Sequence, residues 1–206
     1  MIGFYNYTVI LTYIGASFAL FGIYSVVGDN NPSVAMLMLM LAGLCDMFDG
    51  TVAKTRKRTV SEKRFGIQID SLSDLVCFGV LPAVIGFKIG MQDHIAYYVV
   101  LICFTLAALI RLAYFNVMEE ERQQTTGGPR TCYEGLPVTN VALILPLVYS
   151  FRSYMGTYFP QVYAVSLALI AIAFLLKFKV IKLKLKGMLV CLVIGIAELV
   201  WFVKGF

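Results

Sequence analysis

The sequence contains few charged residues for its length. Only 14% of the 206 residues are Asp, Glu, Lys or Arg, against about one quarter in an ordinary soluble domain. Hydrophobic residues make up 60%, and the mean hydropathy is +0.82. A chain of this composition has too few polar side chains to cover a water-exposed surface. A soluble domain is therefore excluded, and an integral membrane protein is indicated.

The sequence also lacks the patterns of a disulfide framework or a zinc site. Its five cysteines are odd in number, scattered and mostly within apolar runs. The single histidine, His94, is expected in a loop away from the functional region. The N-terminal MIGFYNYT has no basic segment, and no small-residue cleavage site follows the first apolar run, so no secretory signal peptide is expected. The cysteines are Cys45, Cys77, Cys103, Cys132 and Cys191.

Long apolar runs separated by short polar loops take up most of the chain. At roughly 20 apolar residues per span, they predict an all-α fold, a polytopic membrane helix bundle of six to seven transmembrane helices in one domain, residues 1–206. Pro82 predicts a kink or a local adjustment in the third helix. The predicted helices are about Thr8–Val27, Pro32–Lys54, Phe65–Ile89, Ile95–Phe115, Leu136–Ser150 and Val162–Leu176, with Gly187–Val203 as a full or partial last span.

Two polar stretches are expected to connect helices. Residues 116–135, NVMEEERQQTTGGPRTCYEG, contain Gly-Gly-Pro and predict an irregular loop. Residues 177–186, KFKVIKLKLK, largely alternate basic and apolar residues, which in isolation is typical of a β-strand. Because this strip lies between two membrane spans, we expect an interfacial connector instead.

The basic residues predict the orientation in the membrane. With a cytoplasmic N-terminus, the loops after the second, fourth and sixth helices, with the adjoining helix ends, hold 14 of the 17 Lys and Arg residues. This asymmetry is typical of cytoplasmic loops. The net charge of +5 is then juxtamembrane, where it favours anionic lipids, and nucleic acid is excluded as a partner.

Four carboxylates lie within or beside apolar runs, in one stretch of the second and third helices. Asp46 and Asp49 lie about 60° apart around their helix, and Asp70 and Asp74 about 40° apart around theirs. The two helices are antiparallel across a short loop, so the two pairs are expected to face each other. Ionisable groups at membrane depth are costly and indicate function. The structural alternative is ion pairing with the loop cations, but four recessed carboxylates exceed what packing needs.

Four clustered carboxylates would repel one another strongly unless cations were bound. All-oxygen ligation favours hard ions such as Mg²⁺, Mn²⁺ or Ca²⁺, and a two-metal site suits phosphoryl or phosphodiester transfer. Gly50 and Gly66 would allow a bulky phosphate-bearing ligand to approach closely. Lys54, one turn beyond Gly50, is placed for a phosphate oxygen, although a loop cation is also an ordinary topology determinant. We expect a metal-bound diphosphate site that opens to the cytoplasm and to lipid.

This stretch resembles the signature of the CDP-alcohol phosphotransferase family, D-x-x-D-G-x-x-A-R…G-x-x-x-D-x-x-x-D. Seven of the eight signature positions match. The departure is Lys54, where the family usually has arginine, because lysine keeps the charge but lacks the bidentate fork. Arg56 is a candidate to compensate. The corresponding residues are Asp46, Asp49, Gly50, Ala53, Lys54, Gly66, Asp70 and Asp74.

The resemblance implies a reaction in which an alcohol attacks the β-phosphorus of a CDP-linked lipid, CMP leaves and a phosphodiester forms. It also implies two divalent cations, Mg²⁺ or Mn²⁺, a catalytic core at about residues 32–140 and a homodimer. Asp74 would be the base that accepts the hydroxyl proton. The implied metal ligands are Asp46, Asp49, Asp70 and Asp74, and the implied CDP-lipid site is Asp49, Gly50, Ala53, Lys54 and Gly66.

The acceptor is indicated by residues outside the signature. Residues 65–83, 111–116 and 133–140 are similar to the phosphatidylserine synthase branch of the family, which implies CDP-diacylglycerol and L-serine as substrates. Serine needs a cation for its carboxylate, and Arg111 is the candidate, with Asn116 as a neutral partner. The alternative for Arg111 is an arginine whose head group reaches to the membrane surface.

Three other functions are weighed against serine transfer. Glycerol 3-phosphate or an inositol phosphate as acceptor would need a further basic cluster beside the metal site. A divalent-cation transporter would need polar groups distributed across the membrane, whereas these carboxylates cluster at one level. A purely structural membrane protein would not retain four recessed aspartates.

Overall fold

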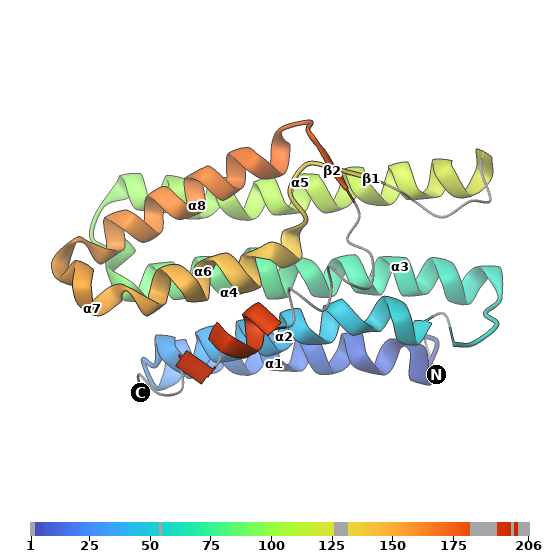
Figure 1. Ribbon diagram of the computed structural model, residues 1–206, viewed down its shortest axis with the longest axis horizontal. Helices are drawn as coiled ribbons and strands as arrows, with labels where there is room; N and C mark the ends of the chain where they lie inside the picture. Colours follow the sequence, from blue (N-terminus) through green and yellow to red (C-terminus); the bar gives the residue numbers. More distant parts are fainter. Residues whose placement is uncertain (1–2, 54, 126–131, 182–192, 199, 202–206) are drawn as a thin grey trace.

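The structure, a computed structural model, describes residues 3–53, 55–125, 132–181, 193–198 and 200–201. Long helices run side by side along one axis and form a bundle (Figure 1). Five helical segments are long and apolar enough to cross a membrane: Tyr7–Gly28, Pro32–Ala53, Val60–Met91, Ile95–Arg122 and Arg152–Leu175, with a shorter apolar helix at Val138–Ser150. The predicted multi-pass helical bundle is therefore confirmed for the described part of the chain.

Most elements are helices, and the described residues also include one pair of short strands. In chain order they are a 3₁₀ turn at Tyr7–Val9, α1 (Ile10–Gly28), α2 (Pro32–Ala53), α3 (Val60–Asp74), a π-helical stretch at Leu75–Val80, α4 (Leu81–Gly86), a second π-helical stretch at Phe87–Met91, α5 (Ile95–Thr125), β1 (Cys132–Glu134), a 3₁₀ turn at Val138–Asn140, α6 (Val141–Ser150), α7 (Arg152–Met155), a 3₁₀ turn at Gly156–Tyr158, α8 (Phe159–Leu175) and β2 (Lys179–Ile181).

Two helices are longer than predicted. The third helix begins at Val60 instead of Phe65, because Thr59 and Glu62 form a capping box at its start. The fourth predicted helix, α5, continues to Thr125 instead of ending at Phe115. Its extension carries a salt bridge between Arg122 and Glu119, three residues apart, at 2.6 Å. The first part of the predicted loop 116–135 is therefore helical.

The third span is irregular directly after the aspartates. A π-helical stretch, Leu75–Val80, follows Asp74, and Pro82 lies in the first turn of α4. Because proline removes one backbone donor and crowds the preceding turn, the wider π turn accommodates it. The hydroxyl of Tyr163 donates a hydrogen bond to the Pro82 carbonyl at 3.1 Å. The local adjustment predicted at Pro82 is present.

The basic strip is not only a connector. Its residues Lys179–Ile181 form β2, which pairs antiparallel with β1. Gly135, at φ +72°, lies against the last turn of α8, where an added Cβ would approach the Leu176 carbonyl oxygen to 3.0 Å. The rejection of a strand was wrong for these three residues, because a strand is set by its pairing partner, and the partner, Cys132–Glu134, lies far earlier in the chain.

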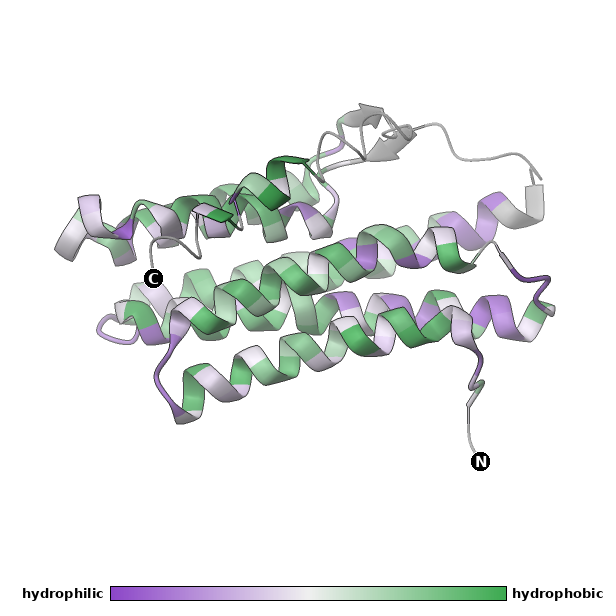
Figure 2. Cartoon of the chain, turned by 60° about the horizontal axis from the view of Figure 1, so that its bottom comes forward, coloured by the Kyte–Doolittle hydropathy of each residue, from purple (hydrophilic) through white to green (hydrophobic). Residues whose placement is uncertain are grey.

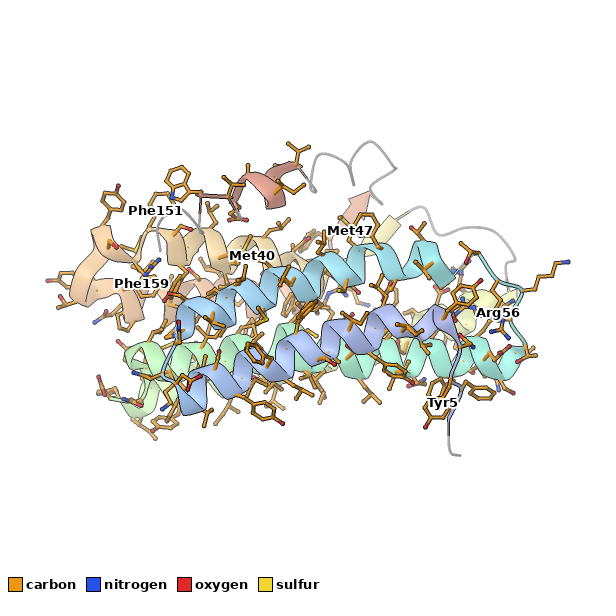
Figure 3. All side chains as sticks on the ribbon, turned by 90° about the horizontal axis from the view of Figure 1, so that it is seen from below. Tyr5, Met40, Met47, Arg56, Phe151 and Phe159 are labelled. Atoms are coloured by element: carbon orange, nitrogen blue, oxygen red, sulfur yellow. The ribbon has the colours of Figure 1, made fainter. Side chains whose placement is uncertain are left out.

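Polar and apolar residues are distributed unevenly along the bundle axis. Figure 2 shows hydrophobic ribbon along most of the long helices and hydrophilic segments gathered mainly at the end near the N-terminus. Tyr5 and Arg56 lie at that end, and Phe151 and Phe159 lie at the opposite end (Figure 3). The last predicted span, Gly187–Val203, falls largely outside the described residues.

One contact between helices is unusually close. At Gly43 of α2, an added Cβ would lie 2.4 Å from the Cβ of Ala142 in α6. Small residues at such a position allow two helix backbones to approach each other. This contact fixes the spacing of α2 and α6 directly beside the carboxylates described next.

Candidate functional site

The four predicted aspartates gather around one cavity between α2 and the third span. Asp46 and Asp49 come from α2, and Asp70 and Asp74 from α3. Single oxygens of Asp46, Asp49 and Asp70 lie within 4.8 Å of one another. Asp74 lines the same cavity. The spacing of three and four residues places each pair on one helix face, and the fold brings the two faces together.

The cavity is small and only partly closed. All four aspartates are half-buried, and the space has a volume of about 10 Å³, enough for one particle of the size of a water molecule. α1 closes one side. The remaining lining residues are Leu11, Thr12, Gly15, Ala42, Cys45, Ser73, Cys77 and Phe78.

Two threonine hydroxyls hold the carboxylates of α2. Thr139 Oγ1 donates to Asp46 Oδ2 at 2.7 Å, and Thr12 Oγ1 is 3.5 Å from Asp49 Oδ2. Neither threonine was predicted as a site residue. Thr139 lies in the stretch 133–140 that was singled out for its family resemblance, but a hydroxyl has no spacing pattern that reveals its partner. Its role depends on α6 packing against α2.

Of the residues that were predicted to line a CDP-lipid site, Gly50, Ala53 and Gly66 lie between the carboxylates and the loop that joins α2 to α3. Gly50 is exposed, and an added Cβ there would meet nothing within 4 Å. Gly66 faces the guanidinium of Arg58, and Ala53 ends α2. Lys54 lies outside the described residues. Open space at Gly50 is compatible with a bulky ligand above the metal ligands.

Arg111 is buried, with 6% of its surface exposed, so the alternative of a head group reaching the membrane surface is wrong. Its Nε donates to the carbonyl of Leu136, and its Nη2 lies 3.4 Å from the carbonyl of Gly135. It therefore fixes the segment that leads to Thr139. Asn116 accepts a hydrogen bond from Ser71 Oγ at 2.8 Å, directly beside Asp70.

The donor set of the cavity fits a hard divalent cation. Three carboxylate oxygens from separate side chains converge there, and the fourth carboxylate lines the same space. Oxygen-only ligation suits Mg²⁺, Mn²⁺ or Ca²⁺. Within the described ranges, this is the one group of three or more acidic, Cys or His side chains that could share an ion.

Replacing Thr139 by valine is expected to lower the affinity for Mn²⁺ roughly 10-fold, because a hydroxyl that orients a metal ligand is typically worth 10–100-fold in affinity. Valine has the shape of threonine without the hydroxyl. Mn²⁺ binding to the detergent-purified protein would be measured by electron paramagnetic resonance. Thr139→Ser is the matched control and should bind as the wild type does; equal affinity in the valine variant would contradict the role of the hydrogen bond.

Fold and site together define a polytopic helical membrane protein with a cluster of aspartates between its second and third spans that could hold a cation. The family model of CDP-alcohol phosphatidyltransferase matches residues 5–201. The chain therefore belongs to the CDP-alcohol phosphatidyltransferase family, as the motif resemblance predicted.

The chain is also similar to individual members of this family. The chain is 41% identical over 116 residues to CDP-diacylglycerol–serine O-phosphatidyltransferase of Saccharomyces cerevisiae, covering 55% of this chain and 41% of the relative. It is 31% identical over 145 residues to archaetidylserine synthase of Methanothermobacter thermautotrophicus, covering 69% and 58%. It is 30% identical over 115 residues to the serine phosphatidyltransferase of Helicobacter pylori, covering 55% and 45%. The matches thus span about half the length of these relatives.

Proposed function

We propose that this protein transfers the phosphatidyl group of CDP-diacylglycerol to the hydroxyl of L-serine, giving phosphatidylserine and CMP. The convergence of three signature carboxylates within 4.8 Å carries the reaction class, since it supplies the cation site that diphosphate chemistry requires. The names of the relatives, two serine phosphatidyltransferases and an archaetidylserine synthase, support serine as the acceptor.

In this proposal the aspartates bind cations, and one of them also accepts a proton. Two divalent cations, Mg²⁺ or Mn²⁺, would be held by Asp46, Asp49, Asp70 and Asp74. When bound, these cations offset the charge of the diphosphate and of the departing CMP. Asp74 accepts the proton of the serine hydroxyl. The hydroxyl oxygen then forms a bond to the β-phosphorus, the phosphoanhydride bond breaks, and CMP leaves with the bonding electron pair.

The surroundings of the carboxylates bind and orient the substrates. The proposed CDP-lipid site consists of Asp49, Gly50, Ala53, Lys54 and Gly66. Holding the acceptor hydroxyl in line with the phosphorus supplies much of the remaining acceleration. A Cβ added at the exposed Gly50 would meet nothing within 4 Å, which supports the approach of a bulky ligand there.

Arg111 and Asn116 are proposed to bind serine. Asn116 is held next to Asp70 through Ser71, and Arg111 contributes a buried positive charge nearby on the same helix. Asn116→Ala is expected to raise the KM for serine roughly 10-fold, because a polar contact to the zwitterion is lost, while the KM for CDP-diacylglycerol changes less than twofold. Steady-state CMP release at varied concentrations of each substrate measures both. An equal rise in both KM values would indicate a structural role instead.

We further propose a single catalytic domain over residues 1–206, with its core at about 32–140, acting as a homodimer in the cell membrane. The N-terminus and the site face the cytoplasm. The concentration of 14 of the 17 basic residues in the expected cytoplasmic loops and adjoining helix ends supports this orientation.

An acceptor assay tests the function. The purified protein in detergent is given CDP-diacylglycerol and Mn²⁺ or Mg²⁺, with serine, glycerol 3-phosphate or an inositol phosphate in turn. CMP release with serine alone is expected. Release with another acceptor would keep the reaction class and replace the substrate. If CMP is released with none of the acceptors, the transferase proposal is wrong. Divalent-cation transport would then be the function to test, in liposomes.

A further inference from the structure

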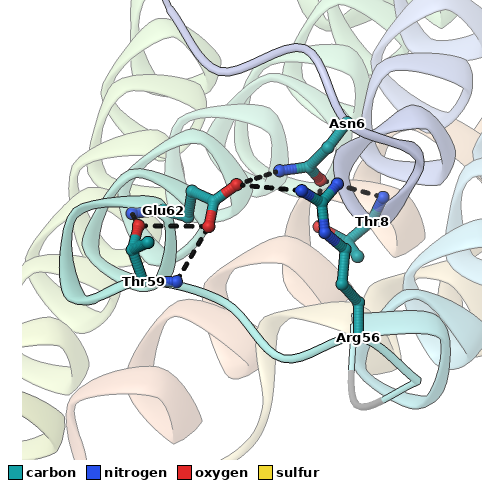
Figure 4. Close-up of polar contacts among 5 residues, drawn as sticks. All are labelled: Asn6, Thr8, Arg56, Thr59 and Glu62. Carbon is teal, nitrogen blue, oxygen red and sulfur yellow. Dashed lines mark hydrogen bonds and ion pairs between the residues drawn. The ribbon is translucent and has the colours of Figure 1, made fainter.

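The loop between α2 and α3 is tied down by a polar network (Figure 4). Glu62 caps α3 together with Thr59 and forms an ion pair with Arg56 at 3.5 Å. Asn6 Nδ2 donates to the same Glu62 carboxylate at 3.2 Å, so the N-terminal segment holds it from the other side. Tyr7 OH and Thr55 Oγ1 lie 3.1 Å apart. These contacts fix the course of the loop.

The basic residues of the loop are not equivalent. Arg56 is exposed and paired with Glu62, and Arg64 is exposed and paired with Glu120 at 3.5 Å. Lys57 and Lys63 are exposed to solvent. Arg58 differs from all of these, since it is half-buried and forms no hydrogen bond or ion pair with any described residue. Arg56, which the sequence suggested as a replacement for the family's arginine, is thus paired with Glu62 in this structure.

The guanidinium of Arg58 lies over the functional face of α3. Its Nη1 is 3.1 Å from the position that a Cβ on Gly66 would occupy. Gly66 is one helical turn before Asp70, on the same face. None of its donors has a partner among the residues that the structure describes, and its planar fork matches phosphate oxygens. The glycine thus leaves space that the Arg58 guanidinium occupies, one helical turn from Asp70, with donors that have no partner among the described residues.

We propose that Arg58 binds a phosphate group of the CDP-linked lipid above Gly66, and so supplies the bidentate contact that lysine at position 54 cannot make. The assignment rests on the proposed function. It names the phosphate oxyanion as the ligand, and the CDP diphosphate as its source. A phosphate head group of the surrounding bilayer is the competing source of the same chemistry.

The test compares Arg58→Gln, Arg58→Lys and the matched control Lys57→Gln, which removes the same charge from an exposed neighbouring side chain. Binding of soluble CDP in the presence of Mn²⁺ is measured by calorimetry on the full chain in detergent. Arg58→Gln is expected to weaken CDP binding roughly 10-fold, because a charge-assisted hydrogen bond is lost. Arg58→Lys should lie between this variant and the wild type, and Lys57→Gln should stay within twofold. Size-exclusion chromatography and thermal unfolding check that all variants are folded.

A second arm separates the two phosphate sources. Turnover is measured in liposomes with and without phosphatidylglycerol. If Arg58→Gln leaves CDP binding unchanged, or alters only the response to the anionic lipid, the assignment to the CDP-lipid is overturned. If the wild type neither binds CDP nor turns over CDP-diacylglycerol, the proposed function itself fails, and the assignment fails with it.

Discussion

Replacing Asp74 by asparagine is expected to lower kcat for phosphatidyl transfer by roughly 10³-fold, because a positioned general base typically contributes 10²–10⁴-fold. The amide has almost the shape of the carboxyl group but cannot accept the serine proton. CMP release at saturating substrates and Mn²⁺ measures the loss. Thermal unfolding of the variant should match the wild type within a few degrees, since the side-chain volume is kept.

Asp70→Asn is the matched control for this prediction. Asp70 lies one turn earlier on the same helix and is proposed only as a cation ligand. Its variant is expected to need more Mn²⁺, and higher Mn²⁺ should recover part of its turnover. Excess Mn²⁺ should not restore Asp74→Asn. Near-normal turnover of Asp74→Asn, or its recovery by Mn²⁺, would show that Asp74 is not the base.

Adding one methyl group at Gly43 is expected to disturb both stability and the metal site. The Cβ of Gly43→Ala would lie 2.4 Å from that of Ala142, so α2 and α6 must separate. Three residues further along α2 is Asp46, and three residues before Ala142 is Thr139, its hydrogen-bond partner at 2.7 Å. The two contacts therefore belong to one antiparallel interface, and a separation at the first lengthens the second.

The expected cost of Gly43→Ala is about 1–3 kcal/mol in the free energy of unfolding, as for other overpacked cores. The affinity for Mn²⁺ should fall roughly 10-fold, as in Thr139→Val. Denaturant unfolding in detergent, followed by circular dichroism, measures the first effect, and Mn²⁺ titration measures the second.

A compensating variant makes the explanation testable. In Gly43→Ala/Ala142→Gly the clashing methyl group on α6 is removed, and the new Cβ would face the Cα of residue 142 at 3.9 Å, an ordinary contact. Stability and Mn²⁺ affinity should both return toward the wild-type values. If the double variant were no better than Gly43→Ala, steric separation of α2 and α6 would not be the cause.

The helical membrane fold and the placement of the aspartates in two pairs on helix faces were predictable because both rest on local patterns. The length of an apolar run determines whether a helix can span a membrane. Spacings of three and four residues place Asp46 beside Asp49 and Asp70 beside Asp74 on one face of a helix, whatever the helix packs against. The boundary errors at Val60 and Thr125 arose where polar side chains stabilise helix ends by capping and pairing.

Other features depend on contacts between distant parts of the chain. The strand at Lys179–Ile181 exists through its pairing with β1, and Thr139 reaches Asp46 only because α6 packs closely on α2 at Gly43. The difference between Arg56 and Arg58 is likewise tertiary, since Glu62, itself bonded to Asn6, pairs with Arg56, whereas Arg58 lies at Gly66. The sequence by itself determined which groups are candidates for the proposed chemistry, because residue type and helical periodicity are local. Only the tertiary structure decided which hydroxyl bonds Asp46 and which arginine lies at Gly66, because hydrogen bonds and ion pairs depend on distances that no spacing along the chain encodes.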